Sequence, residues 1–215
     1  MKQKTLLLAT AVLLLGIFVT AALLYKRSQA EEAIQLAAQH SAHLMRPYSP
    51  TLGADNAPVL IVEFFDPACG TCQAFYAPLK HLLQEHPGKI GLVLRWAPFQ
   101  VGSEHIVALL EAARRQDKFW PVLDALMETQ DEWKPQHEAE LELAMKQLDG
   151  LGLDIDRLRE DMADPEIARR INQDQEDANR LKVDTTPTYY VNGKPLPAFG
   201  FKVLKQTVET ALRGG

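Results

Sequence analysis

Residues 64–72 read FFDPACGTC, and this stretch joins the end of an apolar run to the only two cysteines of the chain. The run over 59–65 (VLIVEFF) is rich in β-branched and aromatic residues, which is typical of a strand buried on both faces. Apolar residues then recur at helical spacing, which predicts a helix over 73–84. Cys69 is therefore expected at the N-terminus of a helix, and Cys72 within its first turn.

The Cys-x-x-Cys spacing favours redox chemistry. Unpaired backbone N–H groups and the helix dipole stabilise a thiolate on Cys69, and Cys72 is near enough to attack a mixed disulfide formed there. Half a zinc site is one alternative, but it needs a second pair of ligands, and His81 and His86 lie beyond the active end of the helix. Attachment of a c-type haem needs His directly after the second cysteine, where this chain has Gln73. The pair therefore predicts a dithiol–disulfide centre with no metal and no further cofactor.

The composition bounds the class of protein. With 215 residues the chain can bury one ordinary core, so we expect one domain with room for an insertion. The formal net charge of -5 and the lack of a Lys and Arg cluster argue against nucleic acid as a partner. Two cysteines are too few for a disulfide scaffold, which leaves them a chemical role.

Residues 1–29 are expected to form a signal-anchor or transmembrane segment. Basic residues precede an uncharged apolar run over 5–25, which at about 1.5 Å per residue is long enough to cross a bilayer. Cleavage as a signal peptide after Ala30 is the alternative. Residues 30–48 then predict a helical spacer, with a short oligomerisation helix as the alternative. Both interpretations place the rest of the chain in the periplasm or another oxidising extracytoplasmic space, anchored to the cytoplasmic membrane or soluble after cleavage.

The middle of the chain predicts an α/β core and a block of helices. Residues 47–58 are rich in turn-forming residues and predict a lead-in loop, and residues 90–96 (IGLVLRW) predict a second buried strand. Strand, helix and strand within this length form a βαβ unit, whose strands are parallel. The acidic residues around 173–177 are expected on a solvated helix face. Helices are predicted over 105–115, 118–129, 137–148 and 154–181, the last broken at Asp164-Pro165.

The chain then returns to strands. Residues 186–191 are rich in β-formers, Asn192-Gly193 is a strong hairpin signal, a short strand follows around Leu196, and a helix over 201–213 closes the chain. We therefore predict an α/β fold with a central mixed sheet, helices on both sides and an inserted all-helical subdomain. The expected divisions are 49–102 and 183–215 for the two parts of the sheet domain and 103–182 for the helical insertion.

Two further positions are candidates for the site. Glu63 precedes Cys69 by six residues on the predicted strand; a buried carboxyl there would have a raised pKa and could relay a proton to or from Cys72, whereas a strand-end glutamate would reach solvent. The Thr186-Pro187 bond could be cis and leave the backbone N–H and C=O of Thr186 free to pair with an extended substrate, whereas an ordinary trans turn is the default.

Three separated motifs resemble the DsbA-like thiol–disulfide oxidoreductases of the thioredoxin superfamily. They are FFDPACGTC at 64–72, SPTLGADNAP at 49–58 and TPTYYVNG at 186–193, and the resemblance covers about residues 50–213. It implies a thioredoxin fold in which Cys69 attacks, Cys72 resolves, Glu63 is the buried acid and Pro187 is the cis-proline facing the disulfide. Thr186, Gly70 and Thr71 are the expected substrate-binding residues.

The resemblance also implies partners, and it has one departure. The expected partners are cysteine-containing client proteins and a membrane redox partner, either a quinone-linked oxidase or a thiol-reducing transporter. The dipeptide is Gly70-Thr71 where the family's strong oxidase has Pro-His, so with Asp66 nearby we expect a less stabilised thiolate and a weaker oxidant. Thr186 and the Asp66-Pro67 lead-in also resemble the disulfide isomerase branch. An isomerase or reductase is thus one alternative, and a thioredoxin-fold holdase or Cu(I)-handling module is the other.

Overall fold

The structure, a computed structural model, describes residues 42–54 and 56–214. The predicted membrane segment 1–29 and most of the predicted spacer 30–48 lie outside these residues. Within the described ranges, no helix combines the length and apolar character needed to span a bilayer. The core is a five-stranded mixed sheet in the order β1-β3-β2-β4-β5, as the sequence predicts for a central mixed sheet.

The predicted βαβ unit is confirmed. β2 (Val59–Phe65) and β3 (Ile90–Trp96) are parallel in a continuous register from Val59 opposite Ile90 to Phe65 opposite Trp96. α2 (Gly70–Glu85) connects them and begins directly after Cys69, which confirms the expected position of Cys69 at the N-terminus of the helix. The predicted lead-in loop is wrong in part, because it contains β1 (Thr51–Gly53), which pairs antiparallel with the free edge of β3. So short a strand carries little sequence signal and depends on the edge to which it hydrogen-bonds.

The C-terminal hairpin is confirmed with small shifts. β4 (Thr188–Val191) is antiparallel to β2, and β5 (Lys194–Pro195) is antiparallel to β4 and lies just before the predicted position at Leu196. Asn192 and Gly193 both have positive φ, 48° and 77°, as a tight turn between twisted strands requires. α9 (Phe201–Gly214) follows.

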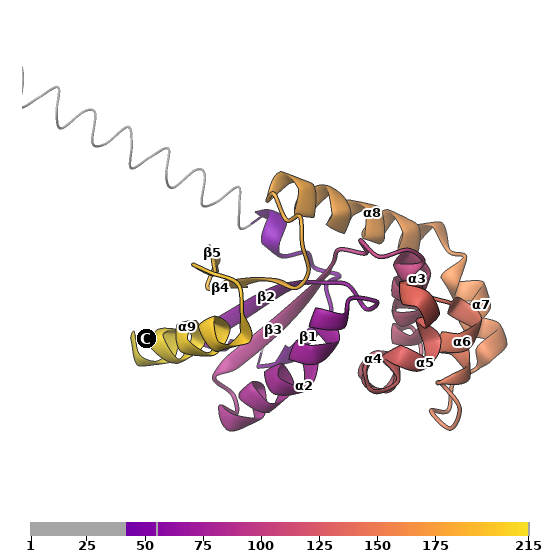
Figure 1. Cartoon of the computed structure of the whole chain (residues 1–215), viewed down its shortest axis with the longest axis horizontal. Coiled ribbons are helices and arrows are strands. Elements are labelled where there is room, and N and C mark those ends of the chain that lie inside the picture. Colours follow the sequence, from indigo (N-terminus) through magenta and orange to yellow (C-terminus); the bar gives the residue numbers. More distant parts are fainter. Residues whose placement is uncertain (1–41, 55, 215) are drawn as a thin grey trace, which may run out of the picture. The chain divides into compact units, whose positions relative to one another are not determined.

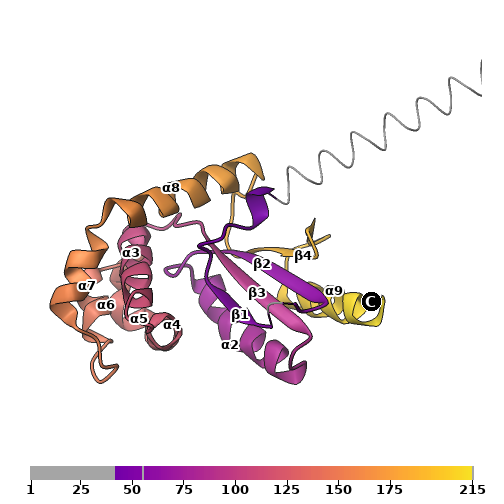
Figure 2. The ribbon, with the colours of Figure 1, turned by 180° about the vertical axis from the view of Figure 1, so that it is seen from behind.

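Helices cover both faces of the sheet. α2 and α9 lie on one side and α8 (Pro165–Arg180) on the other (Figure 1; Figure 2). Alternate residues of β2 separate accordingly, since Ile61 and Phe65 pack into the core with α2 and α9, whereas Val62 and Phe64 pack with Ala178 at the end of α8. The two covered faces explain why β2 reads as a continuous apolar run.

Between β3 and β4 the chain forms a helical block, most of which lies to the side of the sheet in Figure 1, while its last helix, α8, runs back over the sheet. The predicted helix over 137–148 is shorter, because a 3-10 turn and an extended segment come before its α-helical part. The predicted break is confirmed, with the Asp164 carboxylate accepting a hydrogen bond from the N–H of Glu166 at 2.7 Å. The elements are α3 (Ser103–Arg114), α4 (Phe119–Glu128), α5 (Gln130–Trp133), η1 (Pro135–His137), α6 (Leu141–Lys146), α7 (Ile155–Met162) and α8 (Pro165–Arg180).

The acidic stretch of α8 is not solvated as predicted. Asp174 and Asp177 are fully buried, and both accept hydrogen bonds from the buried guanidinium of Arg95 on β3, at 2.8 and 2.7 Å. The Asp174 carboxylate also accepts the backbone N–H of Trp96 at 2.8 Å. Buried charges are tolerated only when paired in this way, and their partners lie about 80 residues away in sequence, which a local charge pattern does not reveal.

Candidate active site

The loop between β2 and α2 places the two cysteines as predicted. Cys69 is the N-cap residue of α2, and its carbonyl accepts the N–H of Gln73 at 3.0 Å. Its side chain is half-buried, whereas Cys72, in the first turn, is fully buried. α2 has no acidic residue in its first turn and no side-chain capping hydrogen bond. The helix N-terminus therefore presents its backbone N–H groups to the exposed sulfur.

The pair is electrostatically asymmetric. A hydrogen bond from the Cys72 thiol, together with further ones from Thr186 and the backbone N–H groups of Thr71 and Cys72, lowers the pKa of Cys69 to about 5 against the opposing effect of burial. Burial, the hydrogen bond to Cys69 and the charge of Glu63 raise the pKa of Cys72 well above its usual value. At neutral pH the reduced site thus holds a thiolate at the surface and a neutral thiol beneath it.

Glu63 is buried, which excludes the solvent-exposed alternative. It lies on β2 opposite Tyr189 of β4, and only 2% of its surface is exposed. Burial raises the pKa of its carboxyl to about 8, against the effect of the hydrogen bond that the Tyr189 hydroxyl donates to Oε1 at 2.8 Å. The carboxyl is thus mostly protonated at neutral pH, and its charge, when present, acts on Cys72.

The cis-proline loop faces the exposed cysteine. The Thr186-Pro187 bond is cis, which is the first of the two alternatives given above and excludes the ordinary trans turn. Cys69 Sγ lies 3.3 Å from the Thr186 carbonyl oxygen, to which the sulfur donates a hydrogen bond when it is protonated. Gly70 is exposed and Thr71 is half-buried beside Cys69. The structure thus brings Cys69 and Thr186 into direct contact.

Asp66 lies in the cysteine loop, near the pair as expected. Its carboxylate is buried and accepts the backbone N–H groups of Ala68, Phe99 and Gln100 at 2.8, 2.7 and 2.8 Å, as well as the Ser103 hydroxyl. Asp66 therefore connects the cysteine loop to the segment before α3. An Asp directly after a strand is a signal for such local backbone bonds.

The helical block also holds this loop, which the sequence did not reveal. Gln130 of α5 is buried, and its Nε2 donates to the carbonyls of Pro67 and Cys69 at 2.8 and 3.2 Å. Lys134, directly after α5, donates from Nζ to the Ala68 carbonyl at 2.8 Å. These contacts join residues 61 to 66 positions apart, so no local pattern could predict them.

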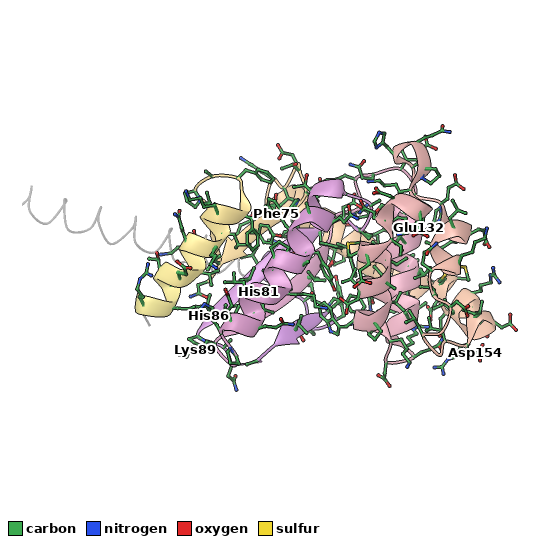
Figure 3. All side chains as sticks on the ribbon, turned by 60° about the horizontal axis from the view of Figure 1, so that its bottom comes forward. Phe75, His81, His86, Lys89, Glu132 and Asp154 are labelled. Atoms are coloured by element: carbon green, nitrogen blue, oxygen red, sulfur yellow. The ribbon has the colours of Figure 1, made fainter. Side chains whose placement is uncertain are left out.

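The other end of α2 takes no part in the site. Phe75 packs against Phe201 of α9 with ring centroids 5.6 Å apart, in a T-shaped arrangement. Figure 3 shows Phe75 toward one end of α2 and His81 and His86 toward the other. These histidines are therefore not placed to complete a zinc site with the cysteines.

A dithiol of this kind, with a low-pKa thiolate outside and a high-pKa thiol beneath it, is equipped for thiol–disulfide exchange. A family model described as "Thioredoxin" matches residues 45–210. The "Probable disulfide bond formation protein D" of Bacillus anthracis is 30% identical over 174 residues, which cover 76% of this chain and 78% of that protein. The solved structure of oxidised BdbD from Bacillus subtilis has a TM-score of 0.66 at 25% identity and covers 77% of this chain and 94% of that one.

A different kind of relative matches only in part. The "Na(+)/H(+) antiporter NhaA 3" of Salinispora tropica is 34% identical over 158 residues, so 70% of this chain corresponds to 23% of the antiporter. This chain spans about a quarter of the length of the antiporters it matches. The chain belongs to the thioredoxin family, among the DsbA-like thiol–disulfide oxidoreductases.

The buried Glu63 carboxyl predicts a pH-dependent stability. The folded chain keeps this proton up to about pH 8, whereas the unfolded chain releases it above its ordinary pKa of 4.5. Wild-type stability should therefore fall relative to Glu63→Gln as pH rises from 4.5 to 8, by up to about 1.4 kcal/mol per pH unit. Urea unfolding of the reduced proteins at pH 5, 6, 7 and 8 measures the difference. The exposed Glu142→Gln change is the matched control, and a Glu63→Gln difference that is independent of pH would contradict the burial.

Proposed function

We propose that the chain is an exported oxidase that forms disulfide bonds in cysteine-containing client proteins through a Cys69–Cys72 disulfide. The pKa of about 5 for Cys69 carries this proposal. A stabilised thiolate makes the dithiol form more favourable and the disulfide more oxidising. This pKa lies between about 3.5 for a strong oxidase and about 7 for a thioredoxin, which supports an oxidant weaker than the strongest of the family.

The exchange proceeds in two displacements. A client thiolate attacks Sγ of Cys69, forming a mixed disulfide and breaking the bond to Cys72, whose sulfur takes a proton from the Glu63 carboxyl. A second client thiolate then attacks the client sulfur, and Cys69 leaves as a thiolate. Glu63 regains its proton from solvent. The client dithiol thus loses two electrons to the Cys69–Cys72 pair, and one of its two protons is released.

The client is held beside the cis-proline loop. Pro187, Tyr189, Leu196 and Phe199 help to line a shallow pocket of about 160 Å³ there, and 64% of Phe199 is exposed. The disulfide sulfur of Cys69 has no S–H to donate, so the Thr186 carbonyl is available to an extended client backbone. Gly70 and Thr71 would contact the same client from the first turn of α2.

The location follows from the sequence of the N-terminus. We propose that residues 1–29 anchor the protein to the cytoplasmic membrane, with cleavage after Ala30 as the alternative, and that 30–48 act as a spacer. The catalytic fold would consist of 49–102 and 183–215, with 103–182 as its helical insertion. A quinone-linked membrane oxidase would restore the disulfide after each cycle. A thiol-reducing transporter would take its place if the protein were an isomerase or reductase.

Transfer of the disulfide to a client tests the direction of electron flow. The oxidised protein, mixed in equimolar amount with a reduced and unfolded client that has two cysteines, should convert most of the client to its disulfide form. The dithiol form of Cys69 and Cys72 should appear in step with it, as quenched thiol labelling and mass spectrometry would measure. Cys69→Ser is the control that should transfer nothing. A wild type that leaves the client reduced, but reduces client disulfides when supplied as the dithiol, would instead be a reductase.

The resolving role of Cys72 gives a second prediction. When Cys69 attacks a client disulfide, a mixed disulfide forms, and the Cys72 thiol is the group within the chain that can attack and break it. Cys72→Ser should therefore accumulate mixed disulfides that wild type resolves. Non-reducing gels of Cys72→Ser after incubation with an oxidised client would show them. Their absence, together with tight Cu(I) binding by wild type, would favour the metal-handling alternative.

A further inference from the structure

We propose that Lys134 is a positioning residue that holds a positive charge against the first turn of α2 and so stabilises the Cys69 thiolate. This inference rests on the proposed function and adds a residue to its site. The charge comes from the helical block rather than from the Cys-x-x-Cys segment, whose Gly70-Thr71 dipeptide carries none.

The Lys134 ammonium lies against the residues on either side of Cys69. Its Nζ is 2.8 Å from the Ala68 carbonyl oxygen and 3.1 Å from Oε1 of Gln130. A Cβ built on Gly70 would be 4.0 Å from Nζ. The ammonium is thus fixed by two hydrogen bonds beside both chain neighbours of the nucleophile, and Lys134 itself is half-buried.

This placement leaves the charge without an ordinary counter-ion. Across residues 42–54 and 56–214, no carboxylate lies within 4.0 Å of the Lys134 ammonium, whose two hydrogen-bond partners are neutral oxygens. The N-terminus of α2 is the positive end of the helix dipole, and its first turn has no acidic residue. A second positive charge here is unfavourable unless an anion is present, and the Cys69 sulfur is the ionisable group at this position.

The remaining ionisable groups around the pair cannot take this role. Cys72 on α2, Glu63 on β2 and Tyr189 on β4 each interact with the pair, and Asp66 holds the loop beneath it. All four are acids, so each is neutral or negative and none stabilises a thiolate by its charge. Hydrogen bonds from Cys72, Thr186 and the backbone are the causes of the low pKa of Cys69, and the charge of Lys134 would act in the same direction.

The competing explanation is that Lys134 has only a structural role, because the hydrogen bond from its Nζ also holds the Ala68 carbonyl in place. Three variants separate the two: Lys134→Met removes the charge, Lys134→Arg keeps it, and Lys80→Met removes an equal charge elsewhere. Lys80 is also half-buried on α2 and is paired with Asp124. It lies eleven residues beyond Cys69, about 16 Å along the helix.

The readout is the pH dependence of Cys69 alkylation by iodoacetamide in the reduced full chain, where Cys72 is buried. The midpoint for Lys134→Met should rise by at least about 0.5 pH unit, a threefold change in acid dissociation. The equilibrium constant with glutathione should shift threefold toward the disulfide, about 15 mV more reducing. Lys134→Arg should restore most of both, and Lys80→Met should match wild type. Salt at 1 M, where the Debye length is about 3 Å, should raise the wild-type midpoint more than that of Lys134→Met.

Two results would overturn the inference in distinguishable ways. If Lys134→Met lowers the melting temperature but keeps the low midpoint of wild type, Lys134 is structural and the proposed function stands. If the wild-type midpoint itself lies near the ordinary cysteine value of about 8.5, there is no stabilised thiolate for Lys134 to support, and the oxidase proposal loses its basis as well.

Discussion

α2 begins with backbone N–H groups that no side-chain oxygen caps, and Cys69 is the residue at this N-cap position. A serine, threonine or aspartate would ordinarily accept these N–H groups. A thiolate can take the same role with a full negative charge, and the N–H groups of Thr71 and Cys72 are among the causes of the low Cys69 pKa. The hydrogen bonds that cap the helix are thus the same ones that stabilise the Cys69 thiolate. Because the thiolate exists only when the pair is reduced, they favour the dithiol form of the site.

That interaction depends on a rigid connection between β2 and α2. The loop's own Asp66 carboxylate binds the segment before α3 on one side, and Gln130 and Lys134 of the helical block hold the loop on the other. Beneath it, Glu63 and Tyr189 supply a buried acid and its hydrogen-bond donor. The helical block therefore contributes directly to the site, in addition to covering one face of the sheet with α8.

The sequence was sufficient where the signal is local. The apolar run, the cysteine spacing and the Asn-Gly turn predicted β2, the start of α2 and the hairpin, because each depends on neighbouring residues. The position of Glu63 on the strand six residues before Cys69 made it a candidate for burial, with a solvent-exposed strand end as the alternative. The sequence was insufficient where a side chain acts through distant partners. Asp174 looked like a solvated residue because Arg95 lies 79 positions away, and Lys134 gave no signal because its acceptor is 66 positions away.

The reduction potential of the Cys69–Cys72 pair tests this account most directly, because it reports how much the folded chain favours the thiolate-bearing dithiol over the disulfide. Equilibration of the full-length protein with defined ratios of reduced to oxidised glutathione measures it. The account predicts a value between about -120 and about -200 mV, that of an oxidant. A value near about -270 mV, that of a thioredoxin-like reductase, would contradict it.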